Sequence, residues 1–131
     1  METRDAARSW ARIWERAWRE HEPELLRAVY AEDCDFRSSP FRSPQDPVAY
    51  AEWAFTGEQA AEPRFGEPLV EGDRAAVPWW TTTIGDDGSE ATIAGCSLLR
   101  FDAAGRVVEE LGYWNAVDAI APFPGWGRPD G

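Results

Sequence analysis

The sequence predicts an α+β fold in which three N-terminal helices pack against one face of a curved antiparallel sheet and form a conical pocket. Apolar residues follow a helical period over residues 5–20, and from Pro63 onward the period changes to two. Helices mostly precede the strands, which is typical of the α+β class. The chain also has eight tryptophans in 131 residues, most at positions that the periodicity turns inward. Indole side chains often line ligand pockets as well as cores.

Three helices are expected before the main sheet. In the first helix, the positions spaced three and four residues apart form one apolar stripe: Trp10, Ile13, Trp14, Ala17 and Trp18. The residues around Pro23 end this helix, and a short second helix follows with proline in its first turn. A strand is predicted over 35–38. Asp46 followed by Pro47 is typical of an N-cap and first turn, and it predicts a third helix.

Four strands are predicted to form the rest of the sheet, at 64–71, 74–84, 90–101 and 106–115, joined by short hairpin-like turns. Pro68 and Pro78 cannot donate to a sheet ladder, so we expect each at a bulge or facing an unpaired side.

The chain is predicted to be one domain, 1–131, with its core at about 5–118. The Pro- and Gly-rich segment 122–131 is expected to be loosely ordered, although Trp126 within it could dock on the body or on a partner chain.

Composition excludes several function classes. A net charge of −11 and an isoelectric point near 4.4 argue against binding to nucleic acid or anionic lipid. No apolar run approaches the ~20 residues of a membrane span, and the charged N-terminus does not resemble a signal peptide, so we predict a cytoplasmic protein. Cys34 and Cys96 are expected to be free thiols, with a disulfide between them disfavoured. No metal-ligand spacing, phosphate loop or dinucleotide fingerprint is present, so neither metal nor cofactor is predicted.

Three segments carry a family resemblance: HEPELLRAVYAEDCDFRSSPF, the helix after DPVAYAEW, and SLLRFDAAGRVVEELGYWN. Over about residues 5–118 the sequence resembles the nuclear-transport-factor-2-like superfamily, in its SnoaL-like branch, whose members share a polyketide cyclase and ketosteroid isomerase-like fold. The resemblance implies a cystatin-like roll with a pocket, and often a homodimer formed through the convex sheet face. The superfamily includes isomerases, cyclases, dehydratases, epoxide hydrolases and non-enzymatic assembly domains, so the fold alone does not select a function.

The ketosteroid isomerase mechanism does not carry over to this sequence. Laid over the chain, the oxyanion tyrosine of those enzymes falls at Trp14, the carboxylate base at Ser38 and the protonated aspartic acid at Ser97. Neither serine nor tryptophan supplies these groups, so steroid isomerisation by that route is excluded. Dehydratases of the superfamily use a cavity histidine, but His21, the one histidine here, is expected in a surface connection. An arginine-bridged carboxylate site of the epoxide hydrolase kind is not evident.

The same overlay predicts which strand residues face the cavity. The inward positions are Phe36, Ser38, Val77, Trp79, Thr81, Ile93, Gly95, Ser97, Leu99, Val108, Glu110, Gly112 and Trp114. A one-residue bulge would invert any of these assignments. On the last strand, Tyr113 and Asn115 are expected to face away from the cone, into a dimer interface.

Glu110 is the candidate catalytic residue, because a carboxyl in an apolar cavity has a raised pKa and can act as a general acid or base near neutral pH. Two alternatives remain open: Glu109 faces inward in its place, or Glu110 is paired with an arginine or an indole N–H. The predicted ligand-binding residues are Trp14, Trp18, Phe36, Ser38, Trp53, Trp79, Ile93, Ser97 and Trp114.

Two classes of function follow. In the first, the cone binds a small apolar molecule, cyclic or aromatic, either as a binding protein or as a cofactor-free lyase, isomerase or cyclase with Glu110 as acid or base. In the second, the indoles fill the cone and the chain is a non-catalytic structural or assembly domain. The sequence does not decide whether the protein is an enzyme. A homodimer is expected from the resemblance.

Overall fold

The computed structural model describes residues 1–125, and Trp126 lies outside the described residues. In chain order the elements are α1 (Thr3–Glu20), the 3₁₀ helix η1 (Pro23–Ala28), β1 (Tyr30–Arg37), α2 (Pro47–Phe55), β2 (Glu58–Phe65), β3 (Leu69–Glu71), β4 (Arg74–Gly85), β5 (Glu90–Phe101) and β6 (Val107–Val117). The predicted α+β class is confirmed. The second helix is a 3₁₀ helix. The strand predicted at 35–38 is longer and begins at Tyr30.

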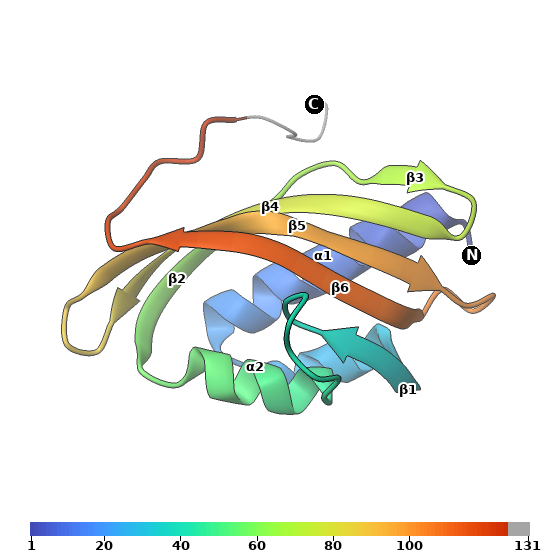
Figure 1. Cartoon of the computed structure of the whole chain (residues 1–131), viewed down its shortest axis with the longest axis horizontal. Helices are drawn as coiled ribbons and strands as arrows, with labels where there is room; N and C mark the ends of the chain where they lie inside the picture. The colour runs from blue at the N-terminus through green and yellow to red at the C-terminus, as the bar shows by residue number, and fades with distance from the viewer. Residues whose placement is uncertain (126–131) are drawn as a thin grey trace.

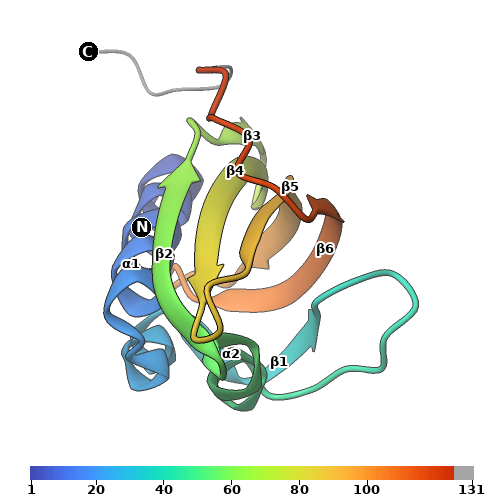
Figure 2. The ribbon, with the colours of Figure 1, turned by 90° about the vertical axis from the view of Figure 1, so that its left-hand side faces the viewer.

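The sheet has the order β1-β6-β5-β4-β2, with β3 paired to β4. β1 runs parallel to β6, and the other pairs are antiparallel. Figure 1 shows α1 and α2 on one side of the long strands β4, β5 and β6. Seen from the end, these strands curve around that side, which makes the helical face of the sheet concave (Figure 2). The curved sheet and the helices together form the cone.

α1 forms because its apolar stripe matches the helical period, and Trp10, Trp14 and Trp18 are all buried. It ends at His21, whose backbone is left-handed with φ 54° and whose neighbour Glu22 donates its N–H to the carbonyl of Ala17. α2 begins as predicted, because the Asp46 side chain accepts a hydrogen bond of 2.9 Å from the N–H of Ala49.

The single strand predicted at 64–71 is wrong. The structure has two strands there: β2 begins earlier, at Glu58, and β3 is short. Small and charged residues dominate the start of β2, and these carry little strand propensity, so the sequence pattern does not reveal it. Pro68 lies in the connection between β2 and β3.

Pro78 lies within β4 and is paired with Cys96 of β5, while its carbonyl accepts a hydrogen bond from Gly66 on the other side. Backbone N–H and carbonyl of one strand residue point to the same side, so the missing N–H of Pro78 faces the break between β2 and β3. This agrees with the expected unpaired side.

One predicted inward residue, Val108, is corrected by the structure. Val107 is completely buried in its place, because the register of β5 and β6 shifts between Arg100 and Phe101. The shift inverts the alternation at the start of β6, whereas Glu110 and Gly112 keep their expected inward direction. On β4 and β5 the predicted inward residues Val77, Thr81, Ser97 and Leu99 are buried.

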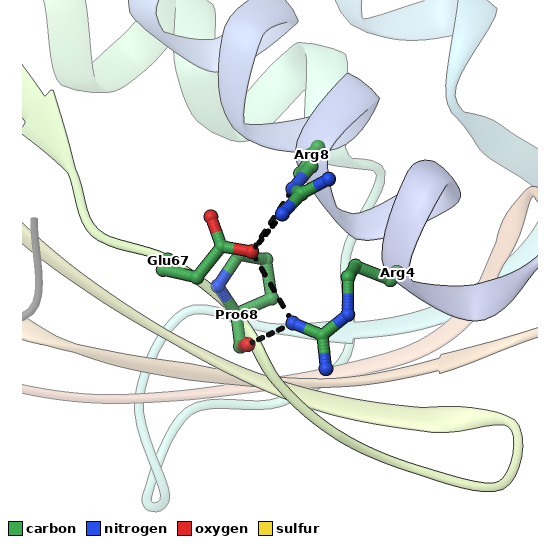
Figure 3. Close-up of polar contacts among 4 residues, drawn as sticks. All are labelled: Arg4, Arg8, Glu67 and Pro68. Atoms are coloured by element: carbon green, nitrogen blue, oxygen red, sulfur yellow. Dashed lines mark hydrogen bonds and ion pairs between the residues drawn. The ribbon is translucent and has the colours of Figure 1, made fainter. Parts of the chain in front are cut away.

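A polar cluster joins the N-terminal end of α1 to the segment that precedes β3 (Figure 3). Arg4 donates to a Glu67 carboxylate oxygen at 3.2 Å and to the carbonyl of Pro68 at 3.1 Å. Arg8 donates to the same oxygen through Nε at 3.0 Å and also through Nη2. These hydrogen bonds lower the pKa of Glu67, with Arg8 as the main cause. These contacts hold the N-terminal end of α1 against the segment that leads into β3.

The outer face of the sheet carries the C-terminal segment (Figure 1). The Trp80 indole N–H donates to the carbonyl of Ala121 at 2.9 Å, and Phe123 packs edge-on against Trp80 with ring centres 6.2 Å apart. Thr92 donates to the carbonyl of Ala119 at 2.7 Å. Tyr113 also lies on this face and is half exposed, as expected for an outward residue. Dimerisation through this face stays a prediction.

Cys34 and Cys96 are both free and half-buried. No helix in residues 1–125 is long and apolar enough to cross a membrane. Within the same residues, no group of three or more His, Cys, Asp or Glu side chains is placed to hold a metal ion.

Candidate functional site

A cavity of about 100 Å³ lies between the helices and the concave face of the sheet. Its wall is mostly aromatic and aliphatic, with a few polar side chains between the rings. The predicted site residues that line it are Trp14, Trp18, Phe36, Ser38, Trp79, Ile93, Ser97, Glu110 and Trp114. The geometry brings these residues together around one cavity. Ligand binding by them stays a prediction.

Glu110 belongs to a buried chain of hydrogen bonds at one end of this cavity. The indole N–H groups of Trp10 and Trp14 approach the Tyr30 hydroxyl oxygen at 3.0 and 2.8 Å, and Tyr30 lies 2.5 Å from Oε1 of Glu110. An indole N–H can only donate, so the tyrosine oxygen accepts from both tryptophans. The single hydroxyl hydrogen of Tyr30 must therefore point at Glu110. Glu110, rather than Glu109, faces inward, and its hydrogen-bond partners are the Tyr30 hydroxyl and the Trp10 indole rather than an arginine.

The surroundings of Glu110 are apolar. On the sheet its neighbours are Phe36 of β1 and Leu99 of β5, both buried. Burial raises the pKa of Glu110 from 4.5 to about 8, against the opposing hydrogen bonds from Tyr30 and Trp10. At neutral pH the folded protein therefore holds Glu110 mainly as the neutral acid. Burial and the nearby Glu110 also raise the pKa of Tyr30, so the hydroxyl keeps its proton.

The two serines of the site are already engaged by neighbouring side chains. Ser97 accepts a hydrogen bond of 3.1 Å from the Trp79 indole. Ser38 accepts one of 3.1 Å from Arg42, and its carbonyl accepts one of 2.7 Å from Trp114. Neither serine has a base beside it, so both are suited to orienting a polar group rather than to nucleophilic attack.

Gly112 is required for the approach of β1 to β6. A Cβ atom there would lie 2.5 Å from the carbonyl oxygen of Ser38. Only glycine leaves room for this carbonyl, which in turn holds the Trp114 indole at the cavity wall.

Glu58 is a second carboxyl on the cavity wall. It accepts from the Trp18 indole N–H at 3.0 and 3.2 Å through its two oxygens, and Nε2 of His21 lies 3.2 Å from Oε1. Burial raises the pKa of Glu58, while hydrogen bonds from Trp18 and His21 lower it. The His21 ring packs on Phe55 with centres 5.7 Å apart. His21 caps the end of α1, but its half-buried side chain also reaches this carboxyl.

The prediction for Trp53 is wrong, because its side chain is 64% exposed and does not line the cavity. The buried face of α2 is formed by Val48, Ala51 and Phe55, and Trp53 lies off that face. It packs instead at a tilt against Tyr50 and under the guanidinium of Arg42, whose Cζ lies 5.4 Å from the ring centre.

Sequence reasoning missed several lining residues: Trp10, Tyr50, Ala54, Phe55, Glu58 and Phe65. Trp10 and Phe55 carried a signal, since both occupy apolar helical positions at the spacing of the core face. Glu58 carried none, because its strand was not recognised. Tyr30 lies at the start of β1, ahead of the strand predicted at 35–38, so its place in the site was not predicted.

Comparisons with known proteins agree with this architecture. The family model described as the SnoaL-like domain matches residues 10–110. A Δ5-3-ketosteroid isomerase from Mycobacterium sp. is 19% identical, with a TM-score of 0.65 over 84% of this chain and 93% of that one. An NTF2-like protein of unknown function from Exiguobacterium is 17% identical, with a TM-score of 0.67 over 87% and 98%. TsrD from Streptomyces laurentii is 12% identical, with a TM-score of 0.70 over 86% and 90%. No curated protein matches the chain. At these identities the solved structures support the fold alone.

Proposed function

This chain belongs to the SnoaL-like domain family, and from that premise we propose that it binds a small apolar molecule about one ring in size and acts on it by cofactor-independent proton transfer. The observation that carries the proposal is Glu110, a buried carboxyl that lines an otherwise largely aromatic cavity. Buried carboxyl groups without a charged partner are rare in structural cores and frequent at sites of acid–base chemistry.

The cavity volume limits the ligand. At about 100 Å³ it is smaller than the ~150 Å³ cavity that is known to enclose benzene. We therefore infer a compact six-membered ring as the ligand core, accommodated by modest adjustment of the walls. A four-ring steroid does not fit in this space, which agrees with the loss of the three ketosteroid isomerase groups at Trp14, Ser38 and Ser97.

The hydrogen bond from Tyr30 directs the acid proton. Because Tyr30 donates to Oε1, the neutral Glu110 carries its own proton on Oε2. A ligand carbonyl that accepts this hydrogen would be polarised, and transfer of the proton would produce a carboxylate that Tyr30 continues to stabilise. The same carboxylate can then take a proton from a neighbouring carbon. This sequence of steps suits an isomerase, a lyase or a cyclase.

The test is a titration of intrinsic tryptophan fluorescence with cyclohexanone and, for size, with a four-ring steroid ketone. We expect saturable quenching by the single-ring ketone, a weakened response in Glu110→Gln and no saturable response to the steroid. The variant Glu109→Gln is the matched control, because the neighbouring carboxyl is exposed and does not line the cavity. No response to any single-ring compound would refute the proposal and favour an assembly domain.

A further inference from the structure

We propose that Glu58, held by Trp18 and His21, is a second polar anchor of the cavity, and that the ligand is a six-membered ring with a carbonyl at one end and a hydroxyl at the opposite end. This inference rests on the proposed function and deepens it by naming the substrate class. The carbonyl would face Glu110, and the hydroxyl would face Glu58.

The two carboxyls occupy opposite ends of one cavity. Through the sheet register, Glu110 is aligned with Leu99 and Ala75, near the start of β4, whereas Glu58 pairs with Gly85 at its end. The helix shows the same separation. The Glu110 end contacts Trp10 and Trp14 through Tyr30, and the Glu58 end contacts Trp18.

The spacing fits one ring. Trp14 and Trp18, which contact the two ends, are four residues apart on α1, and Trp10 and Trp18 are eight apart, which corresponds to ~6–12 Å along the helix axis. Substituents at positions 1 and 4 of a six-membered ring point to opposite ends of the ring, whereas those at positions 1 and 2 point to the same end.

Glu58 has acceptor capacity left for a ligand. An ionised carboxylate offers about four lone-pair sites, and the contacts with Trp18 and His21 use both sites on Oε1 and one on Oε2. The carboxyl is held on two sides and lines the cavity. A ligand hydroxyl that donates to Oε2 would complete its coordination.

His21 is placed at some cost to the backbone. Its φ of 54° lies in the left-handed region, and a helix end of this kind favours glycine. The imidazole is nevertheless positioned 3.2 Å from Oε1 and packed on Phe55. We therefore assign His21 as a positioning residue that orients Glu58.

The experiment compares 4-hydroxycyclohexanone with 4-methylcyclohexanone, which has nearly the same shape and lacks the hydroxyl. Calorimetric Kd values are measured for the wild type and for Glu58→Gln, His21→Gly and the control Glu62→Gln. Glu62 is an exposed carboxyl on the same strand that does not line the cavity. We expect the wild type and the control to bind the hydroxyl compound at least ~10-fold more tightly than the methyl compound.

In Glu58→Gln and His21→Gly the preference for the hydroxyl compound over the methyl compound should fall to less than ~3-fold. His21→Gly should also keep or raise the Tm, because glycine suits that backbone. Equal affinity of the wild type for the two compounds would overturn the second anchor and leave the proposed function standing. Failure of the wild type to bind either compound, together with no response to cyclohexanone, would overturn both.

Discussion

Replacement of Glu110 by glutamine should remove a large part of the decline in stability that the wild-type protein undergoes as the pH rises. Burial holds the pKa of Glu110 at about 8, against an ordinary value of 4.5. Between these two values the folded protein retains the proton and the unfolded chain releases it, so each rise in pH favours the unfolded state. Below pH 4.5 the Glu110 carboxyl is neutral in both the folded and the unfolded state, and its stabilisation of the fold is complete. Above pH 8 it is ionised in both states, and this stabilisation is lost.

The size of the effect follows from the same two values. A difference of about 3.5 between them, at about 1.36 kcal/mol for each pKa unit, corresponds to about 5 kcal/mol of unfolding free energy. This is a large fraction of the 5–15 kcal/mol typical of a whole domain. Glutamine cannot ionise, so the variant should lose this dependence while it keeps an acceptor for the Tyr30 hydroxyl.

The assay is urea unfolding followed by circular dichroism from about pH 5 to about pH 8.5, on the wild type, Glu110→Gln and Glu109→Gln. The difference in unfolding free energy between the wild type and Glu110→Gln at each pH reports the titration of Glu110 alone, because all other titratable groups are the same in both proteins. We expect the two curves to converge at low pH and to separate by several kcal/mol at pH 8, while Glu109→Gln stays parallel to the wild type. Parallel curves for Glu110→Gln would refute the reasoning.

Four further predictions concern packing and polar contacts elsewhere in the fold and around the site. Tyr30→Phe leaves two indole N–H groups without their acceptor, and urea unfolding should show a loss of about 2–4 kcal/mol; a loss below about 0.5 kcal/mol would contradict this. Gly112→Ala brings a Cβ into the carbonyl of Ser38, so we expect a lower Tm together with weaker ketone binding, and an unchanged value of either would count against the packing argument. Thr81 has a buried hydroxyl without a partner among residues 1–125, so Thr81→Val should raise the unfolding free energy by about 1 kcal/mol, and a decrease would show that the hydroxyl is satisfied. Glu67→Gln should lower the Tm at low salt and have little effect near ~1 M salt, where charges are screened over ~3 Å; equal losses at both salt concentrations would show that the contact is not electrostatic.

Elements with a strong local signal were predictable from the sequence. The stripe of apolar residues predicts α1, and the Asp46–Pro47 pair predicts the start of α2 within a residue. The overlay on the resembling family placed Glu110 and Ser97 on the inward side, and this held because long strands keep a period of two unless a bulge intervenes. The bulge near Arg100 is such an interruption, and no residue pattern announces it, which explains the error at Val108.

The rest of the site depends on contacts between residues far apart in the sequence. Tyr30 and Glu110 are eighty positions apart, and Trp18 and Glu58 are forty apart. Periodicity reports which face of its own element a residue occupies, and it does not report its partner on another element. Trp53 shows the opposite error, since a large apolar side chain was expected inside and lies largely in solvent.

Carbon-13 NMR of glutamate carboxyl groups tests the central claim most directly, with the Glu110 signal assigned by its absence in Glu110→Gln. The account predicts a signal of the neutral acid at pH 7, a midpoint near the pKa of about 8, and a change in that signal when cyclohexanone is added. A carboxylate signal at pH 6 that does not respond to any single-ring ketone would contradict it.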